Sequence, residues 1–388
     1  MQHLNKSTAS VHTGTTTDPK RESGITTPVY HSTSYGYLDT EKKSYPRYYN
    51  VPNQQAVVAK LCALEHGEDG LVFSSGMAAI TTTFLAHLKK GDHVVLQGGI
   101  YGGTRHMVEK EFPRMGITFS FTASRFIDDF RREIRPETKM IYIETPSNPL
   151  LEVTDIEAIA ALGQEKGLLT VIDNTFASPI NQNPLDWGID IITHSATKYL
   201  GGHSDLSCGA VISSQVLMEP IRHTATSFGG TLNAHDCFML ERSLKTLAIR
   251  VERQNQNAMV LAQFLAENPE IDRVFYPGLP DHPDHELAKK QMFDFGAMMA
   301  FEVRNRNTVQ FQHNLKLIQP AMSLGGLETI VCSPAMTSHE KIGPEGCAAI
   351  GISDQLIRLS VGIEDVDDLI QDLQQALEST PELSQVES

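Results

Sequence analysis

Hydrophobic and polar residues follow two periodicities along the middle of the chain, one typical of strands and one typical of helices. Short apolar runs rich in β-branched residues predict strands, and runs with helical spacing separate several of them. The expected strands are 70–75, 92–97, 139–149, 168–179 and 189–192, and the expected helices among them are 57–67, 76–91 and 156–167. Strands that alternate with helices predict an α/β fold with a mostly parallel sheet covered on both faces.

The pattern changes toward both ends of the chain. Residues 1–52 are rich in Thr, Ser, Tyr and Pro with little periodicity, and they predict an extended arm. After residue 240 the pattern indicates a long helix over 236–268, a turn-rich stretch, a strand over 296–303 and a final helix over 365–379. We therefore expect three parts: an arm (1–52), a large domain (53–240) and a smaller C-terminal α/β domain (241–388).

Length and composition limit the class of protein. With 388 residues the chain is too long for one ordinary core, and 40% hydrophobic with 20% charged residues is ordinary for a globular protein. A formal charge of −15 argues against nucleic acid and anionic membranes as partners. The five cysteines form no CxxC pair, and the N-terminus has no apolar signal core. These features favour reduced thiols and a cytoplasmic location.

Candidate chemistry gathers where expected strands end, which is where open parallel sheets bind their ligands. Ser75, Gly76 and Met77 follow a strand and open a helix, so their N–H groups could hold a phosphate; a simple serine N-cap is the alternative. Asp173 directly follows an apolar strand, where a carboxylate needs a cationic partner unless it only caps a turn.

Two cationic residues complete the set. Lys198 follows the strand at 189–192 and has Ser195 and Thr197 beside it, which suggests a chemical lysine; a surface lysine near a loop is the alternative. Arg358 lies inside an apolar strand, which suggests a carboxylate clamp; an ion pair at a strand edge is the alternative. Tyr101, flanked by glycines after another strand, could stack on a ring or simply occupy a turn.

A phosphate cradle, a strand-end carboxylate, a lysine and an arginine are together the parts that pyridoxal phosphate requires. The lysine forms a Schiff base, the carboxylate keeps the ring nitrogen charged, and the arginine holds an amino-acid carboxylate. The pair His282 and His285 could be read as metal ligands, but we expect no metal site. We treat His194 and His203, which flank the lysine, as structural residues.

The segment "VIDNTFASP…WGIDIITHSATKYLGGHSD" resembles the signature of the Cys/Met-metabolism (trans-sulfuration) family of pyridoxal-phosphate enzymes. That family includes cystathionine β- and γ-lyases, methionine γ-lyase, cystathionine γ-synthase and O-acylhomoserine sulfhydrylases. The resemblance covers nearly the whole chain, through "YPRYYN", "FSSGMAA", "YGGT", "ETPSNP", "SLGG" and "RLSVGIED" in order. It implies the aspartate-aminotransferase-like fold (fold type I) and a homotetramer built from two dimers.

The resemblance also implies roles for individual residues. Lys198 would bind the cofactor covalently and carry protons, and Tyr101 would stack on its ring and assist acid–base steps. Asp173 would pair with the ring nitrogen, and Asn148 would contact the ring hydroxyl. The phosphate would be held by Ser75, Gly76, Met77, Ser195 and Thr197, with Tyr45 and Arg47 reaching it from a neighbouring subunit. Arg358 and Ser323 would bind the substrate carboxylate.

Substrate specificity is where this sequence departs from patterns in the family. Members that act on cystathionine at the γ position resemble one another in having a glutamate before the "SLGG" serine, where this chain has Met322. Gly103 stands where methionine γ-lyases typically have cysteine. The stretch "YYNVPNQ" also carries one residue more than the usual "NPT" pattern, just after Arg47.

We therefore expect a pyridoxal-phosphate-dependent C–S lyase that eliminates the sulfur group from a sulfur amino acid of the cystathionine or methionine type. The products would be a keto acid, ammonia and a thiol. The alternative within the family is a γ-replacement enzyme of the cystathionine γ-synthase or O-acylhomoserine sulfhydrylase type. A catalytically silent binding protein is disfavoured, because Lys198, Asp173, Tyr101 and Arg358 are all present.

Overall fold

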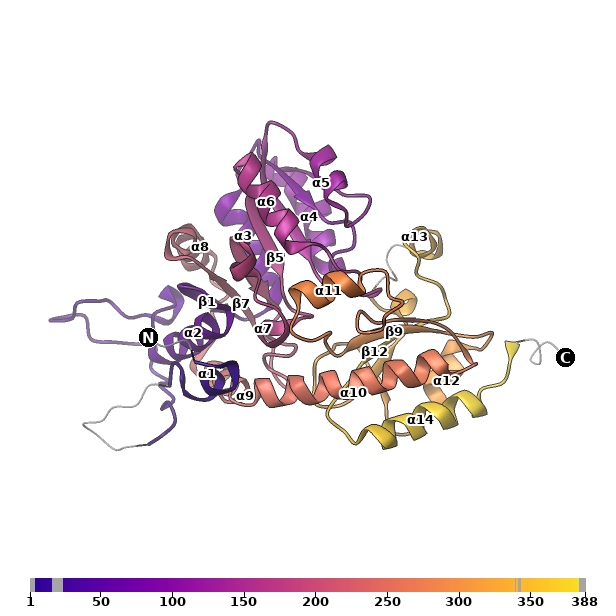
Figure 1. Ribbon diagram of the computed structural model, residues 1–388. Helices are drawn as coiled ribbons and strands as arrows, with labels where there is room; N and C mark the ends of the chain where they lie inside the picture. Colours follow the sequence, from indigo (N-terminus) through magenta and orange to yellow (C-terminus); the bar gives the residue numbers. More distant parts are fainter. Residues whose placement is uncertain (1–3, 16–23, 339, 341–342, 384–388) are drawn as a thin grey trace. The chain divides into compact units, whose positions relative to one another are not determined.

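The computed structural model describes residues 4–15, 24–338, 340 and 343–383 (Figure 1). The chain divides into two compact units. The first comprises the residues up to Glu144 together with Thr154–Ile249, and the second comprises Thr145–Val153 together with the residues from Arg250 onward. The sequence pattern placed this change at residue 240, which lies inside helix α9 (Ala234–Leu244).

A seven-stranded sheet forms the centre of the first unit. Its strands in spatial order are β1 (Asp69–Phe73), β7 (Gly209–Ser213), β6 (Ile191–His194), β5 (Leu169–Asp173), β4 (Thr138–Glu144), β2 (His93–Leu96) and β3 (Thr118–Phe121). Neighbouring strands from β6 to β3 are parallel, whereas β7 is antiparallel to both β6 and β1. The predicted mostly parallel sheet is thus confirmed.

Helices of the first unit cover both faces of this sheet. They are α1 (Lys6–His12), α2 (Pro52–Glu65), α3 (Gly76–His87), α4 (Gly102–Met115), α5 (Ile127–Glu133), α6 (Ile156–Lys166), α7 (Ser178–Asn181), α8 (Gln215–Phe228) and α9, with 3₁₀ turns η1 (Pro46–Tyr48) and η2 (Pro184–Trp187). Alternate strand residues feed two separate cores: Ile191 belongs to the core that contains residues of α3, α4 and α8, and Ile192 to the core that contains residues of α5 and α6.

The second unit contains a five-stranded sheet. Its order is β10 (Gln319–Pro320), β11 (Ile330–Cys332), β12 (Leu356–Ser360), β9 (Met298–Val303) and β8 (Ile271–Phe275). Strands β11, β12, β9 and β8 pair antiparallel, and β10 joins β11 in parallel. The helices are α10 (Leu247–Glu267), which begins in the first unit, α11 (His285–Gln291), α12 (Thr308–Asn314), α13 (Gly343–Ala349) and α14 (Val366–Ser379), with the 3₁₀ turn η3 (Pro334–Met336).

The helix expected over 236–268 is two helices. Helix α9 ends at Leu244 and α10 begins at Leu247. Lys245 N donates to Arg242 O and Thr246 N donates to Ser243 O, so tighter bonds to the third residue back replace the α-helical pattern. The hydrophobic spacing continues through this break, which is why the sequence pattern predicted one helix.

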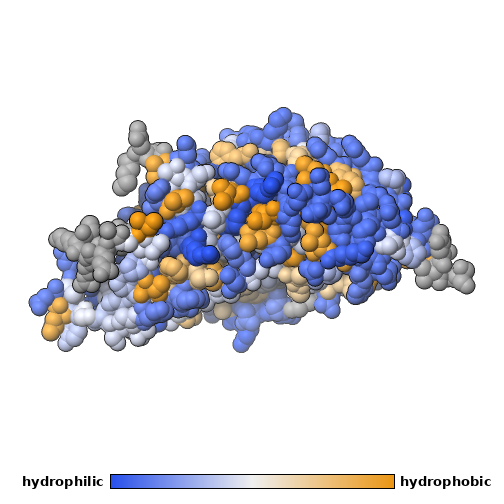
Figure 2. Space-filling model, turned by 90° about the horizontal axis from the view of Figure 1, so that it is seen from below, coloured by the Kyte–Doolittle hydropathy of each residue, from blue (hydrophilic) through white to orange (hydrophobic). Residues whose placement is uncertain are grey.

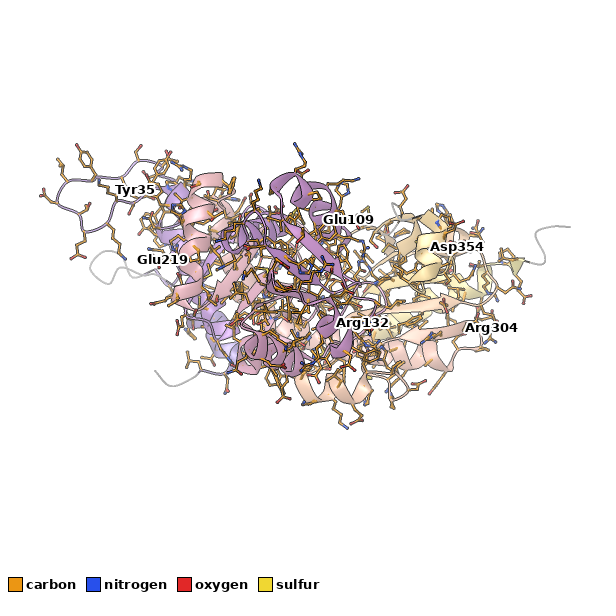
Figure 3. The ribbon with its side chains drawn as sticks, turned by 90° about the horizontal axis from the view of Figure 1, so that it is seen from above. Tyr35, Glu109, Arg132, Glu219, Arg304 and Asp354 are labelled. Carbon is orange, nitrogen blue, oxygen red and sulfur yellow. The ribbon has the colours of Figure 1, made fainter. Side chains whose placement is uncertain are left out.

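The N-terminal segment differs in part from the extended arm that the sequence predicted. Residues 6–12 form α1, which contacts α2, while residues 24–45 contain neither helix nor strand and project from the first unit (Figure 1). Figure 3 shows Tyr35 on this projecting loop. Several large apolar side chains of the loop are exposed, with exposed fractions of 87% for Ile25, 67% for Tyr37 and 71% for Leu38.

The surface is otherwise that of a strongly charged protein. Hydrophilic residues cover most of the face shown in Figure 2, and hydrophobic residues lie on it in separate patches. Among the residues described, no helix has both the length and the apolar character needed to cross a membrane.

Candidate active site

Asp173 is a buried carboxyl at the end of β5. Its Oδ1 accepts hydrogen bonds from Thr175 Oγ1 (2.5 Å) and Thr175 N (3.1 Å), and its Oδ2 accepts one from Tyr142 Oη (3.4 Å). Burial raises the pKa of the Asp173 carboxyl above its usual value, and the bonds from Thr175, the charge of His194 and the bond from Tyr142 oppose this rise. A cationic group facing Asp173 would stabilise its ionised form.

Residues 195–202 form a tight turn after β6, beside Asp173. Ser195 N donates to Thr175 Oγ1 (2.8 Å), so the hydroxyl that holds Asp173 also holds the start of this turn. Lys198 N donates to Ser195 O and Gly202 N donates to Lys198 O, which fixes the backbone around the half-buried Lys198. The hydroxyl of Thr197 accepts from Cys208 N (3.0 Å) and donates to Cys208 O (3.1 Å).

The N-terminus of α3 lies against the same turn. A Cβ atom on Gly76 would lie 2.8 Å from Ser195 Cβ and 2.9 Å from Ser195 Cα, so only glycine allows this approach. Ser75 caps the helix by accepting a hydrogen bond from Ala78 N (3.1 Å). The N–H groups of Gly76 and Met77 begin the helix and have no intrahelical acceptor, which makes this end suited to an anion. The structure thus brings Gly76 and Ser195, two of the residues predicted to hold the phosphate, together.

Tyr101 begins α4 and stays half-exposed. Its N–H donates to Glu144 Oε2 (2.7 Å), which ties the start of α4 to the end of β4. A Cβ atom on Gly103 would lie 2.4 Å from Tyr101 Cε1, so the ring occupies the space that a side chain at position 103 would fill. Thr104 Oγ1 contacts Met77 Sδ (3.9 Å), which connects this region to the start of α3.

Tyr45 and Arg47 lie on and beside η1, away from the contacts just described. Arg47 Nη1 donates to Thr226 O of α8 (2.6 Å), and its guanidinium lies near the rings of Tyr45 and Tyr48. The residue added relative to the family pattern falls in the link to α2, where Tyr49 adopts a left-handed conformation (φ 57°). The contact of Tyr45 and Arg47 with a phosphate in another subunit remains a prediction.

Arg358 is the central charged residue of the second unit. It is 6% exposed on β12; its Nη1 donates to Asn148 Oδ1 (2.8 Å) and its Nη2 donates to Ser323 O (3.0 Å). Ser323 has a positive φ of 103°, which is unusual for a residue other than glycine and is typical of a constrained loop. Asn148, expected at the cofactor ring, here orients Arg358, and Met322 is 70% exposed beside Ser323.

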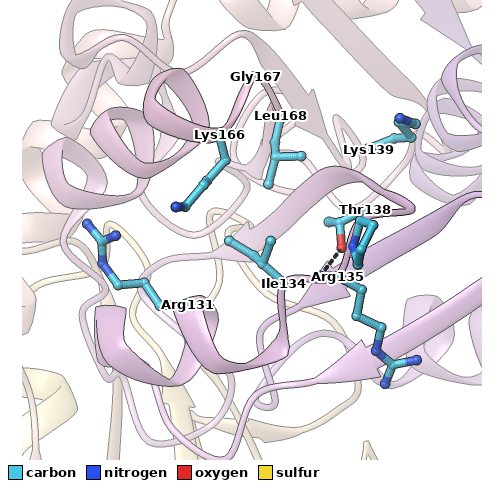
Figure 4. Close-up of a pocket in the computed structure, with 9 residues that line it drawn as sticks. Arg131, Ile134, Arg135, Thr138, Lys139, Lys166, Gly167 and Leu168 are labelled. Carbon is cyan, nitrogen blue, oxygen red and sulfur yellow. Dashed lines mark hydrogen bonds between the residues drawn. The ribbon is translucent and has the colours of Figure 1, made fainter.

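Two further features lie outside these groups: the segment of His282, which the sequence offered as a metal ligand, and a cavity of the first unit. His282 Nδ1 accepts a hydrogen bond from Asp284 N (3.1 Å) in a turn, and Asp284 Oδ2 accepts one from Val153 N (2.9 Å), so this histidine segment serves as a structural brace. A cavity of about 440 Å³ lies on the first unit among α5, β4 and the end of α6 (Figure 4). Its lining, which includes Arg135 and Lys139, shares no residue with the candidate site.

Several residues that hold the site are not apparent from the sequence pattern. Thr175 links Asp173 to Ser195, and a hydroxyl two residues after an aspartate is a signal that could have identified it. Glu144 gave no such signal, because it lies far from Tyr101 in the sequence. Glu65, at the end of α2, binds His194 at 2.5 Å, and the strand pattern does not predict that contact.

Comparison with known proteins agrees with this geometry. The profile of the family described as Cys/Met metabolism PLP-dependent enzyme matches residues 7–378. The chain is 42% identical to a cystathionine gamma-lyase of Bacillus subtilis, covering 97% of this chain and 100% of the relative. It is also 42% identical to a cystathionine beta-lyase of Lactococcus lactis subsp. cremoris, covering 96% and 98%.

A solved structure is similar over almost the whole length. The crystal structure of cystathionine gamma-lyase from Lactobacillus plantarum complexed with L-serine gives a TM-score of 0.94 at 39% identity, covering 97% of this chain and 100% of that one. This likeness confirms the predicted aspartate-aminotransferase-like, fold type I architecture. The family and its lyases confirm the prediction of a pyridoxal-phosphate-dependent carbon–sulfur lyase.

The residues present fit this cofactor. The anion-binding start of α3 beside Ser195 suits a phosphate, and the buried carboxyl of Asp173 suits a protonated ring nitrogen. Ser195 follows β6 and Asp173 ends β5, so these two residues lie at the carboxyl ends of neighbouring parallel strands, where a fold of this class places its ligands. By sequence, by fold and by the chemistry of these side chains, the chain belongs to the family of Cys/Met-metabolism PLP-dependent enzymes.

Proposed function

We propose that this enzyme removes the sulfur group from an amino acid of the cystathionine or methionine type and releases a keto acid, ammonia and a thiol. One observation carries the proposal: the buried carboxyl of Asp173 is joined through Thr175 to Ser195, which stands three residues before Lys198. The predicted ring-nitrogen partner, phosphate contact and lysine thus belong to one connected set of residues.

The residues divide the work by their chemistry. When bound, pyridoxal phosphate withdraws electrons from the substrate Cα and makes its proton acidic. Lys198 would attach the cofactor, remove the α-proton and return it at a later stage, and Tyr101 would stack on the ring and assist in proton transfer. Asp173 would hold the ring nitrogen in its protonated form.

The remaining contacts would fix the cofactor and the substrate. Ser75, Gly76, Met77, Ser195 and Thr197 would bind the phosphate, and Asn148 would reach the ring hydroxyl as well as Arg358. Arg358 would pair with the substrate carboxylate, helped by Ser323, because a guanidinium matches a carboxylate with two parallel hydrogen bonds.

The substrate follows from the residue that precedes Ser323. Met322 cannot pair with a distal ammonium group, so γ-elimination from cystathionine is disfavoured, and either β-elimination or an apolar substrate such as methionine fits better. In β-elimination the sulfur leaves once the α-proton is removed. In γ-elimination a proton must also leave Cβ before the sulfur departs from Cγ.

The assembly would be a homotetramer that acts in the cytoplasm. The exposed Ile25, Tyr37 and Leu38 support a covered arm, because burying several large apolar side chains of one loop is favourable. The buried, free cysteines of the described residues suit a reducing compartment. Mixing Arg47→Ala chains with Lys198→Ala chains tests the shared site: recovered activity supports it, and no recovery in a verified mixed oligomer contradicts it.

The deciding experiment identifies the keto acid released from L-cystathionine by mass. Pyruvate means β-elimination, and 2-oxobutyrate means γ-elimination and shows that Met322 does not exclude cystathionine. If neither forms, methionine is tested next, and then an activated homoserine with a thiol, where a replacement product would favour the γ-replacement alternative. Turnover that survives in Lys198→Ala would overturn the assignment.

A further inference from the structure

Glu65 is a carboxylate that the proposed chemistry does not use, although it is completely buried. It is the last residue of α2 and 0% exposed. Its Oε1 accepts hydrogen bonds from His194 Nε2 (2.5 Å) and Asn174 Nδ2 (2.9 Å), and its Oε2 accepts one from Asn183 Nδ2 (3.4 Å). Burying a carboxylate costs several kcal/mol unless such partners compensate it, so a specific role is expected.

The partners of Glu65 stand next to the cofactor residues. Asn174 directly follows Asp173, and His194 directly precedes Ser195. Alternation along the strands puts His194 on the face of Ile192 and Asn174 on the face of Ile172, opposite to Asp173. Glu65 therefore joins the ends of β5 and β6 from the side that the cofactor residues do not use.

We propose that Glu65 and His194 form a clasp that fixes the distance between Asp173 and Ser195 and so positions the ring nitrogen and the phosphate of the cofactor together. This inference rests on the proposed function, and both residues are positioning residues rather than catalytic ones. A carboxylate held by His194 and Asn174 sets the separation of two strand ends more firmly than the few backbone bonds between these short strands.

The charges around the clasp support this arrangement. Because the acceptor is a carboxylate, His194 donates through Nε2–H, which orients its ring. Asp173 lies close enough to His194 for the two to interact electrostatically, and Lys6 lies close enough to Glu65. Lys6 also donates to Pro179 O (2.5 Å) and Ile180 O (2.9 Å), so a cation of α1 stands near the buried carboxylate.

The test measures cofactor binding rather than turnover. Wild type, Glu65→Gln, His194→Gln and the double variant are stripped of cofactor and titrated with pyridoxal phosphate, with visible circular dichroism recording the orientation of the bound ring. We expect each single variant to bind about tenfold more weakly or worse, with a changed dichroic band. The double variant should bind about as weakly as the worse single variant, because both break one contact.

His93→Gln is the matched control. His93 is a fully buried histidine of the same sheet, held by Thr138 Oγ1 (2.8 Å) and Ser120 Oγ (3.2 Å), but on β2 at the other end of the strands. It should lower stability while leaving the affinity and the dichroic band unchanged. Unchanged affinity in Glu65→Gln, or an equal loss in His93→Gln, would overturn the clasp.

If the variants fail to fold, a second measurement on wild-type protein tests the clasp. In ¹⁵N-labelled wild-type protein, His194 should show a slowly exchanging imidazole N–H at Nε2, assigned by its proximity to the side-chain amide of Asn174 on the same Glu65 oxygen; an unprotonated Nε2 would overturn the clasp. Failure of the proposed function looks different. In that case wild-type protein itself would show no cofactor band that depends on Lys198.

Discussion

Arg358 Nη1 donates to Asn148 Oδ1 at 2.8 Å, and this bond joins a residue of β12 to one more than 200 positions earlier in the chain. Because Nη2 donates to Ser323 O, both terminal nitrogens of the guanidinium are hydrogen-bonded. An arginine held in this way presents its donors in one orientation, which suits recognition of a planar carboxylate.

Replacing Arg358 by lysine should therefore damage substrate binding more than cofactor binding. Lysine keeps the charge but cannot make two parallel bonds, so we expect kcat/KM to fall about 10- to 100-fold. The absorbance band of the bound cofactor should persist. Steady-state kinetics beside a pyridoxal-phosphate titration would separate the two effects, and an equal loss of cofactor affinity would argue against the role.

Gly76→Ala should weaken binding of the cofactor more than it lowers the stability of the fold. The new Cβ would lie 2.9 Å from a backbone atom of Ser195, so α3 and the turn must move apart. We expect about tenfold weaker binding of pyridoxal phosphate or worse, since overpacking typically costs 1–3 kcal/mol. Gly24→Ala, where nothing lies within 4 Å, is the control and should bind as wild type does.

A bulky residue at position 103 should displace Tyr101. In Gly103→Cys the Cβ would meet the Tyr101 ring at 2.4 Å, so the ring must leave its position. If the ring assists proton transfer, turnover should fall about tenfold while thermal stability stays near that of wild type. Turnover of cystathionine and methionine, measured side by side, checks this, and unchanged rates would show that the ring position does not matter.

Met322→Glu should shift the enzyme toward cystathionine. The variant places a carboxylate where a distal ammonium could pair with it, and exposed pairs of this kind contribute up to about 1 kcal/mol. We expect kcat/KM for cystathionine to rise several-fold relative to that for methionine. Met336→Glu changes another exposed methionine of the second unit by the same charge, so an equal shift there would point to net charge instead.

The buried Lys60 should contribute a stabilisation of the first unit that grows with pH in mild alkali. Lys60 donates to Ser10 O (2.8 Å), and burial lowers its pKa from 10.5 to about 8. Between those pH values the unfolded chain binds the proton and the folded chain does not, so this group makes the free energy of unfolding increase with pH. Lys6, whose pKa burial also lowers to about 8, acts in the same sense.

Lys60→Met removes one of these two groups. In urea unfolding from pH 7.5 to 10.5, the free energy of unfolding of wild type should increase relative to that of the variant as pH rises. The buried Lys60 is 0% exposed, so methionine can occupy its space without uncovering new surface. An identical pH profile in the two proteins would show that Lys60 keeps an ordinary pKa.

Most of the sheet could be predicted from the sequence because each of its central strands is a short apolar run. The run over 168–179 nevertheless ends as a strand at Asp173, because Asn174 turns away to bind Glu65. Helices α4 and α8 gave weaker signals, because they carry Pro113 and Pro220 in their interiors.

Individual site residues were predictable where a family motif marks them, and unpredictable where a distant contact positions them. Lys198, Asp173 and Gly76 stand in local motifs. The contact of Glu65 with His194 joins residues 129 positions apart, and hydrophobic spacing carries no information about such a pair. The bond between Asn148 and Arg358 joins residues 210 positions apart, and the sequence pattern does not predict it either.

The chain enters the second unit at Thr145, leaves it after Val153 and returns at Arg250. During synthesis Asn148 therefore leaves the ribosome long before Arg358. Residues 145–153 can join the second unit only after its five-stranded sheet has been made. A protein cut after Ile249 would give one fragment in which residues 145–153 lack their sheet, and another in which Arg358 keeps Ser323 O but loses Asn148 Oδ1 as an acceptor. The two units are consequently not exchangeable modules, and recombination that preserves the bond between Arg358 and Asn148 must carry residues 145–153 along with the C-terminal part.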